Sequence, residues 1–442
     1  MITATRQVMR AATRRVAKAL RGRSFEAAGG GRRWQTTPAM QAPQTEALAA
    51  RGTIMQRARA ASVNNPTAAR GLETWVGALA GRPVQAMPQH PDTGLRRGLS
   101  DDFEAIVNPL LVQVVRGVVR DGEAFLRLVS DEDGRTRLQL LPPEQIDPTL
   151  SQDLGGGRRI VAGVELDASD RPVAYHVLPE VPGSAFVSYA PPVRVPAADM
   201  LHIFDPILPG QVRGLSWLAP ILLKLNELDR TSDAMLAAVK TQSLLTGFIT
   251  DPTGEGGGFA GDGQGGAVQA SLEPGSVHVL PVGASVSFSN PGTGLAQATE
   301  FLREQKREIA AGLGVTYEQV SADLSGTNYS SARVGLLEFR RRAQMLHRTL
   351  IVDQLLRPLW RRWIDAEVLA GRLTADPELY RVTFAPPGFD WVDPAKEVAA
   401  EVAAIEARLK SRAEVVAARG RDVADLDEEI AADAARQTEG QP

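Results

Sequence analysis

The alternation of apolar and polar positions gives its strongest helical signal between residues 300 and 364, where a polar loop interrupts it once. Residues 300–313 pair opposite charges three positions apart and keep apolar side chains on one stripe, which predicts an amphipathic helix. Gly314 stands where such a helix ends. The segment 323–331 is then rich in hydroxyls and amides, and a second helical pattern follows it.

The second helix of this stretch is long and basic. Its apolar positions include Val334, Leu337, Leu346, Leu350, Leu355, Leu359 and Trp363. It carries eight arginines, at positions 333, 340, 341, 342, 348, 357, 361 and 362, against only two acidic residues. Pro358 predicts a bend, because proline removes one backbone hydrogen bond and clashes with the preceding turn. Such a helix spans roughly 50 Å, which suits a subunit that packs against copies of itself.

Before this stretch, helices give way to β-structure. Helices are predicted over residues 45–62 and 66–80. A loop is predicted at 83–98, followed by a helix that starts at Asp101 or Asp102. Alternating patterns and turn signals then predict six short strands, at residues 123–129, 135–141, 160–166, 172–178, 193–195 and 200–204.

Helices also flank a glycine-rich segment in the second half of the chain. One is predicted from about residue 214 to 245, with Leu236 and Val239 on its apolar side. The segment 251–267 is predicted to be a flexible excursion among short strands at 247–249, 276–280 and 285–288. Three helices are predicted after Pro394, at 394–409, 411–418 and 422–436.

Composition narrows the classes of function. A chain of 442 residues with 43% hydrophobic residues is expected to form two or more compact units. No run of eighteen apolar residues occurs, so no membrane partner is expected. The absence of cysteine excludes disulfides, zinc–thiolate sites and cysteine nucleophiles. The net charge of −3 argues against a tight, general DNA binder, because duplex DNA is itself a dense polyanion.

The first 34 residues form a basic segment, with nine Lys or Arg and a single acid. Mitochondrial transit peptides have this composition. A solvated basic arm, with contact to nucleic acid or a partner as an option, is the favoured interpretation.

The sequence lacks the usual signatures of catalysis and ligand binding. The five histidines lie far apart and none has a metal-ligand spacing, so no metal and no cofactor is predicted. Residues 256–261 match G-x-G-x-x-G without a surrounding βαβ pattern, and no P-loop sequence occurs. The acids at 131–134 lack the remaining ligands of a calcium loop. Carboxylates far apart in sequence could still converge in the fold, so an enzyme is disfavoured but not excluded.

The arginines of the long helix and the polar loop before it each allow two interpretations. The arginines either form solvent-facing and inter-subunit ion pairs, which is favoured, or contact nucleic-acid phosphates. Asn328 and Tyr329 are either ordinary turn residues or neutral hydrogen-bonding groups facing a passing polyanion. Neutral groups make contacts without the counterion release that holds DNA in place.

Seven short motifs stand in one order along the chain and carry a family resemblance. They are 62–70 (SVNNPTAAR), 121–125 (DGEAF), 199–204 (DMLHIF), 210–220 (GQVRGLSWLAP), 309–315 (IAAGLGV), 323–333 (DLSGTNYSSAR) and 391–394 (WVDP). Together they resemble the lambda-type family of tailed-phage portal proteins, the head–tail connectors. The resemblance covers about residues 45–435.

This resemblance implies an α+β portal fold with a mixed α/β wing, stem helices, a small β-containing clip, a long kinked tunnel helix and a helical crown. The implied regions are a basic arm and linker at 1–44, the wing at 45–213, stem helix one at 214–246, the clip with its Gly-rich insert at 247–292, stem helix two at 293–320, the tunnel loop and tunnel helix at 321–365, the returning part of the wing at 366–393 and the crown at 394–442.

The implied function is a non-enzymatic, dodecameric ring at one capsid vertex of a phage, a prophage remnant or a gene transfer agent. The ring passes double-stranded DNA during packaging and ejection, and it seeds head assembly. Implied partners are other copies of the chain, the terminase large subunit, the major capsid and scaffold proteins and the head–tail adaptor proteins. The implied location is the virion, with bacterial cytoplasm during assembly.

The resemblance also assigns candidate residues to the channel. The candidates for its narrowest lining are Ser325, Gly326, Thr327, Asn328, Tyr329 and Ser330. The candidates for contact with DNA or an adjacent subunit are Arg333, Arg340, Arg341 and Arg342. Two alternatives from other classes are a hydrolase or other enzyme in the wing-like β region and a basic-helix nucleic-acid-binding regulator.

Overall fold

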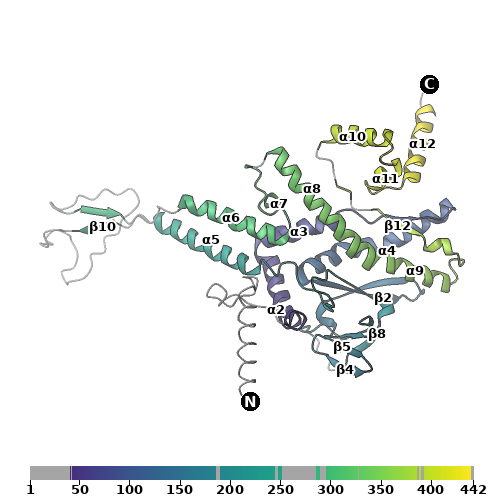
Figure 1. The fold of residues 1–442 in the computed structure, drawn as a ribbon, viewed down its shortest axis with the longest axis horizontal. Coiled ribbons are helices and arrows are strands. Elements are labelled where there is room, and N and C mark those ends of the chain that lie inside the picture. Colours follow the sequence, from purple (N-terminus) through teal and green to yellow (C-terminus); the bar gives the residue numbers. More distant parts are fainter. Residues whose placement is uncertain are drawn as a thin grey trace, which may run out of the picture. The chain divides into compact units, whose positions relative to one another are not determined.

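The computed structural model describes residues 40, 42–185, 190–243, 247–250, 285–288, 295–326, 328–385, 388–389 and 393–439 (Figure 1). The chain divides into two compact units, Met1–Ala47 and Leu48–Pro442. Helices and small antiparallel sheets alternate in the second unit, so the predicted α+β class is confirmed.

The first helices begin at side-chain caps. Helix α2 covers Pro43–Asn64, and α3 covers Pro66–Ala80. The Asn65 side chain accepts the Ala68 backbone N–H at 2.9 Å, and proline at the next position needs no such partner. Both predicted helices are therefore confirmed.

Helix α4 starts earlier than the sequence analysis predicted. It covers Thr93–Asp121, and its cap is Asp92, whose carboxylate accepts the Leu95 N–H at 3.0 Å. Part of the predicted loop at 83–98 also forms strand β1, Ala86–Pro88. The start at Asp101 or Asp102 was wrong, because both are exposed within the helix. Two glycines in the true first turns, at 94 and 98, weaken the local helical signal.

Two small sheets follow α4. The first has the order β3-β2-β9, from β2 (Glu123–Ser130), β3 (Thr136–Leu141) and β9 (Met200–Phe204). The second has the order β4-β5-β6-β7-β8, and its strands are β4 (Gln152–Gly155), β5 (Arg158–Val161), β6 (Val164–Leu166), β7 (Pro172–Val177) and β8 (Val193–Pro196).

Two turns in these sheets bear on predictions made from the sequence, the acidic turn at 131–134 and the strand at 160–166. The acids at 131–134 close the β2–β3 hairpin, where the Asp131 carboxylate accepts the Asp133 and Arg135 N–H groups at 3.0 and 2.7 Å. The single strand predicted at 160–166 was wrong. It splits into β5 and β6, because Ala162 and Gly163 both take positive φ angles, of 47° and 82°.

Two helices of the second half of the chain, α5 and α6, lie side by side (Figure 1). Helix α5 covers Leu222–Ser243, so the start predicted at 214 was too early, and α6 covers Leu295–Leu313. Lys224 of α5 pairs with Glu308 of α6 at 2.7 Å. Strands β10 (Gly247–Thr250) and β11 (Ser285–Phe288) pair beyond these helices, whereas the predicted strand at 276–280 and the Gly-rich insert lie outside the described residues.

The long helix has three consecutive parts. They are α8 (Tyr329–Leu346), a π-helical segment η6 (His347–Leu356) and α9 (Arg357–Leu369). A capping box precedes them at the start of α7 (Tyr317–Ser321), with Thr316 and Gln319 as its members. The hydrogen-bonding pattern already changes at His347, well before the Pro358 that was predicted to disturb it.

Burial varies along this helix. In η6 and α9, the predicted apolar positions Leu350, Leu355, Leu359 and Trp363 are buried. In α8, Leu346 is also buried, whereas Val334 and Leu337 are 67% and 50% exposed. Leu236 on the predicted apolar side of α5 is likewise 53% exposed. Periodicity marks an apolar face but does not say what covers it.

Tryptophans join the long helix to the other elements of the core. The Trp75 ring packs edge-on against Trp217 at 5.2 Å and lies 4.9 Å from Phe339 of α8. Its indole N–H donates to the Leu313 carbonyl at 3.0 Å. Strand β12 (Val382–Phe384) pairs with β1 and brings the later chain back to the same core.

The tail forms three short helices, α10 (Pro394–Glu406), α11 (Arg412–Ala417) and α12 (Val423–Glu439). Ser411 caps α11 by accepting the Glu414 N–H at 3.1 Å, as predicted. Arg97 of α4 forms ion pairs with Glu428 and, at 3.6 Å, Asp425 of α12. These exposed ion pairs connect the tail helices to α4.

We expect acid to destabilise the protein through His347. Burial lowers its pKa from 6.5 to about 4, so between these pH values the unfolded chain binds a proton that the folded chain does not. Folding stability should therefore fall as pH drops through this window, by about 3 kcal/mol at most. Urea unfolding at several pH values should give a flatter profile for His347→Leu. A profile identical to that of the wild type would contradict this role.

Candidate functional site: a polar loop, an arginine-bearing helix and a buried ionic network

The polar loop before α8 is ordered at its base by Asp323. One carboxylate oxygen accepts the Ser325 N–H at 3.0 Å and the Ser325 hydroxyl at 2.6 Å. The other accepts the Tyr317 hydroxyl at 3.2 Å. The Ser325 hydroxyl, with help from these other donors, lowers the pKa of Asp323. The loop therefore starts at a fixed negative charge, and Ser325 and Gly326 are exposed beyond it.

Asn328 ends the loop by capping α8. Its side-chain oxygen accepts the Ser331 N–H at 2.9 Å and the Ser331 hydroxyl at 3.0 Å. This is the local, structural role that the sequence analysis weighed against channel lining. Thr327 lies outside the described residues, as do the side chains of Tyr329 and Ser330.

The four candidate arginines do not form one patch. The Arg342 guanidinium lies 5.5 Å from the Trp75 ring and turns toward the core of the chain. Arg340 lies 5.3 Å from the Phe389 ring, at the side where the tail helices begin. Arg333 and Arg340 line a groove against α10, and Arg341 lines the groove that continues to α11. Three of the four therefore face the tail helices.

Further along the helix, two arginines have partners within the chain. Arg357 pairs with Asp353 at 2.5 Å. Arg362 donates to the carbonyls of Ala197 and Met200 at 2.9 and 3.3 Å. These contacts agree with the favoured interpretation of the arginines as structural.

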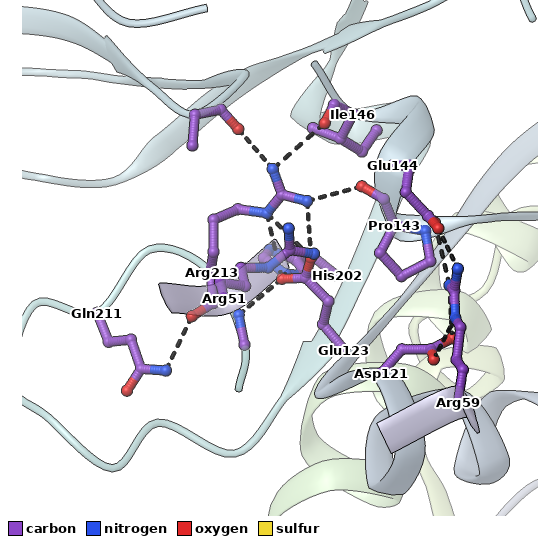
Figure 2. A network of polar contacts seen from close by, with 12 residues as sticks. Arg51, Arg59, Asp121, Glu123, Pro143, Glu144, Ile146, His202, Gln211 and Arg213 are labelled. Atoms are coloured by element: carbon purple, nitrogen blue, oxygen red, sulfur yellow. Dashed lines mark hydrogen bonds and ion pairs between the residues drawn. The ribbon is translucent and has the colours of Figure 1, made fainter. Parts of the chain in front are cut away.

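The strongest electrostatic feature of the chain lies elsewhere, at Glu123 of β2 (Figure 2). Its carboxylate is fully buried and accepts hydrogen bonds from Arg213 at 2.7 and 3.0 Å and from the Gly214 N–H at 2.7 Å. Arg51 of α2 and His202 of β9 also donate to it. Burial alone raises the pKa of Glu123, but Arg213 and Arg51 outweigh it and hold the pKa well below its usual range.

Arg213 connects the two sheets. Besides Glu123, its guanidinium donates to the carbonyls of Pro143, Ile146 and Ala162, at 2.8, 3.3 and 2.6 Å (Figure 2). Ala162 lies in the β5–β6 turn, whereas Glu123 lies in the other sheet. The buried side chain therefore satisfies backbone oxygens that sheet pairing leaves unused.

His202 is a neutral member of this network. Burial lowers its pKa, and the Glu123 carboxylate can only accept, so His202 donates from Nε2 at 3.0 Å. Its ring stacks between Phe125 and Phe204, at 4.1 and 4.5 Å. His202 is thus a structural histidine whose hydrogen bond is satisfied within the chain.

Two glycines allow the network to form. Gly122 ends α4 with a φ of 97°, and a Cβ there would overlap the backbone of Leu215 and Ser216. A Cβ on Gly214 would overlap the backbone of Gly122 in turn. The motifs 121–125 and 210–220 therefore meet backbone to backbone. In each of these two motifs a glycine stands next to a charged residue, and this is the feature of the sequence that marks the site.

Helix α2 adds a second ionic contact beside the first. Arg59 donates to Asp121 at 2.8 Å and also pairs with Glu144 (Figure 2). Burial raises the pKa of Asp121, but Arg120 and Arg59 outweigh it and lower the pKa. Arg51 thus holds α2 against β2, and Arg59 holds it against the end of α4 and the turn after β3.

No metal-binding cluster accompanies this network in the described ranges. No cluster of three His, Asp or Glu side chains there could hold a metal ion. Among the helices that the structure describes, none has the length and apolarity to cross a membrane. The Glu123 carboxylate and its arginine partner are closed to solvent, so this pair cannot reach a substrate.

Comparison with known proteins identifies the family. Residues 30–347 match the family described as phage portal protein, lambda family. A probable portal protein of Halomonas phage phiHAP-1 is 30% identical over 336 residues, and portal protein B of Escherichia phage lambda is 27% identical over 353 residues. These matches cover 72% and 69% of this chain. The chain spans 64% of the length of either relative.

A solved structure supports the same fold. A chain from the neck of a native gene transfer agent particle, computed with C12 symmetry, is 18% identical with a TM-score of 0.50. The match covers 83% of this chain and 91% of that one. The fold is thus that of a portal subunit. By its sequence the chain belongs to the lambda family of phage portal proteins.

Removing the charge of Glu123 tests the buried network. Glu123→Gln leaves Arg213 and Arg51 buried without a counter-charge, which should cost about 3–5 kcal/mol in the free energy of unfolding. Glu165→Gln is a matched control, because Glu165 also binds an arginine and a histidine, but its partner Arg194 is half-exposed. It should cost below about 1 kcal/mol. Equal costs in chemical denaturation would contradict the assignment.

Proposed function

We propose that the protein is the portal subunit of a tailed phage or a related DNA-transfer particle. Copies form a dodecameric ring whose central channel passes double-stranded DNA. Family membership is the observation that carries this proposal. The chain has no ATP-binding signature, so the ring is passive and the terminase supplies the energy for packaging.

Uncovered apolar side chains support assembly into a ring. Large apolar residues on the stem helices and on α8 are about half or more exposed in the single chain: Leu223, Leu236, Val239, Phe301, Val334, Leu337 and Met345. Monomeric proteins rarely leave so many apolar groups on neighbouring helices in contact with water. A neighbouring copy is the natural cover for them.

The regions proposed from the sequence fit the observed elements. The pairing of β1 with β12 supports a wing built from residues 45–213 and 366–393. Helices α5 and α6 form the stem, and β10 and β11 belong to the clip. The loop at 321–328 with α8, η6 and α9 forms the tunnel, and residues 394–442 form the crown.

The proposed partners follow from this arrangement. They are other copies of the chain, duplex DNA, the terminase large subunit, the capsid and scaffold proteins and the head–tail adaptors. The protein then acts in the virion and, during assembly, in the bacterial cytoplasm. The enzymatic alternative loses its best candidate, because the perturbed carboxylate–histidine pair at Glu123 is buried and fully engaged.

The ring proposal predicts that a charge on the stem blocks assembly without unfolding the chain. Leu236 is 53% exposed, so Leu236→Glu should change the stability of the single chain by about 0.5 kcal/mol or less. An uncompensated charge in a subunit contact should abolish rings. Light scattering should give the mass of twelve 47.4-kDa subunits for the wild type and of one for the variant.

The control for this experiment is Leu369→Glu, which makes the same change at the end of α9, where the leucine is 90% exposed. It should assemble normally. If the wild type stays monomeric even with scaffold protein present, the ring proposal is wrong. If Leu236→Glu still forms rings, the stem does not take part in the contact between subunits.

The channel role of the loop predicts a packaging defect in assembled rings. Asn328→Ser with Tyr329→Ala removes the amide and the phenol but keeps a capping oxygen for α8. Its rings should form normally and package or retain less DNA. Asn328→Ala with Tyr329→Ala should reduce packaging in the same way. Because this variant also loses the capping oxygen, the start of α8 should be less stable by about 0.5–2 kcal/mol.

The Ser-containing variant separates the two roles of Asn328. Normal packaging by this variant would contradict channel lining. Failure of both variants to assemble would make the loop a structural element only.

A further inference from the structure

The basic side of α8 faces an acidic side of the crown helix α10. Arg333 and Arg340 line a groove of about 240 Å³ whose opposite wall carries Glu397 and Glu401. Spacings of seven residues on α8 and four on α10 place each pair on one helix face. Carboxylates of one element and arginines of another thus line the same open groove.

The arginines are held toward this groove. The Arg340 guanidinium lies 5.3 Å from the Phe389 ring, which fixes its direction. Arg333 lies close enough to Asp393, the cap of α10, to lower its pKa, although Lys396 has the larger effect. Glu401 also accepts both hydrogen bonds from Lys410 at 3.0 Å. The α10 side of this surface therefore carries both acidic and basic groups.

Helix α10 is weakly attached to the rest of the chain. None of its residues is buried, and its Val398 and Val402 are 43% and 48% exposed. The contact with α8 is thus polar and open to water, where charge pairs are weak and screened by salt. Such a contact can yield to a competing polyanion.

We propose that Glu397 and Glu401 occupy the place of DNA phosphates on the arginines of α8, so that duplex DNA and α10 compete for Arg333 and Arg340. The inference rests on the proposed function, in which DNA passes along α8. DNA in the channel displaces α10, and DNA leaving the channel lets it return.

The competition explains how arginines can line a DNA path without holding DNA there. Each phosphate bound by an arginine releases counterions, so exposed arginines retain DNA strongly at low salt. When the carboxylates bind the same arginines again, they reduce the free energy that DNA gains from counterion release. The chain's net charge of −3 acts in the same direction.

The first test measures binding of a fluorescent DNA duplex to full-length protein. Glu397→Gln with Glu401→Gln should bind roughly threefold to tenfold tighter than the wild type. Its affinity should fall more steeply between roughly 50 and 200 mM salt, because more phosphate contacts form. Glu406→Gln is the matched control, since Glu406 is exposed on the same helix and does not line the groove.

The second test follows the contact itself. The chain has no cysteine, so Leu337→Cys with Ala400→Cys gives a single crosslinking pair across the groove. The disulfide should form readily in free protein, and added duplex should slow it. Glu397→Gln with Glu401→Gln should slow it without DNA.

Each remaining outcome decides against the competition. The competition is contradicted if the three proteins bind DNA with equal affinity, or if added DNA does not change the rate of disulfide formation. Absence of DNA binding by all three also overturns it. A DNA-packaging assay with the same variants then tells whether the proposed portal function fails too, because normal packaging would leave that function intact.

Discussion

The ion pair between Glu123 and Arg213 is the constraint on which the rest of the fold depends. Both side chains are closed to water, so each charge is tolerable only because the other is present. The pair fixes the end of α4 against the loop before α5, and Arg213 then reaches the second sheet through three carbonyls. Arg51 attaches α2 to the same carboxylate. One buried negative charge thereby sets the positions of two helices and two sheets.

The sequence predicts contacts between residues that are close together in the chain, but it does not predict which distant residues meet. The caps at Asn65, Thr316 and Ser411 were predictable, because a cap and its target lie three residues apart. Glu123 and Arg213 are 90 positions apart, and ordered motifs marked both segments without indicating that they meet. The sequence also gave no sign that Arg342 turns to Trp75, since helical spacing does not fix the direction of a long side chain.

The apolar positions of α5 and α8 were predictable, but which of them are buried within the chain was not. Leu350 and Val334 are both among the predicted apolar positions of the long helix, yet Leu350 is buried and Val334 is exposed. A single chain can bury only the faces that its own elements reach, and the remaining faces need another molecule. The uncovered apolar residues include members of α5, α6 and α8, and α8 also carries the candidate arginines. The proposed function therefore rests on surfaces that the single chain does not bury.

The long helix connects these two kinds of surface. Its first part, α8, carries exposed apolar residues and the arginines that face α10, whereas η6 and α9 are anchored in the core. The change falls at His347, where the hydrogen bonding becomes π-helical. π-helical turns inside α-helices are rare and frequently stand at functional sites. Because η6 contacts β9, this change of hydrogen bonding lies where the long helix packs beside the strand that carries His202 of the Glu123 network.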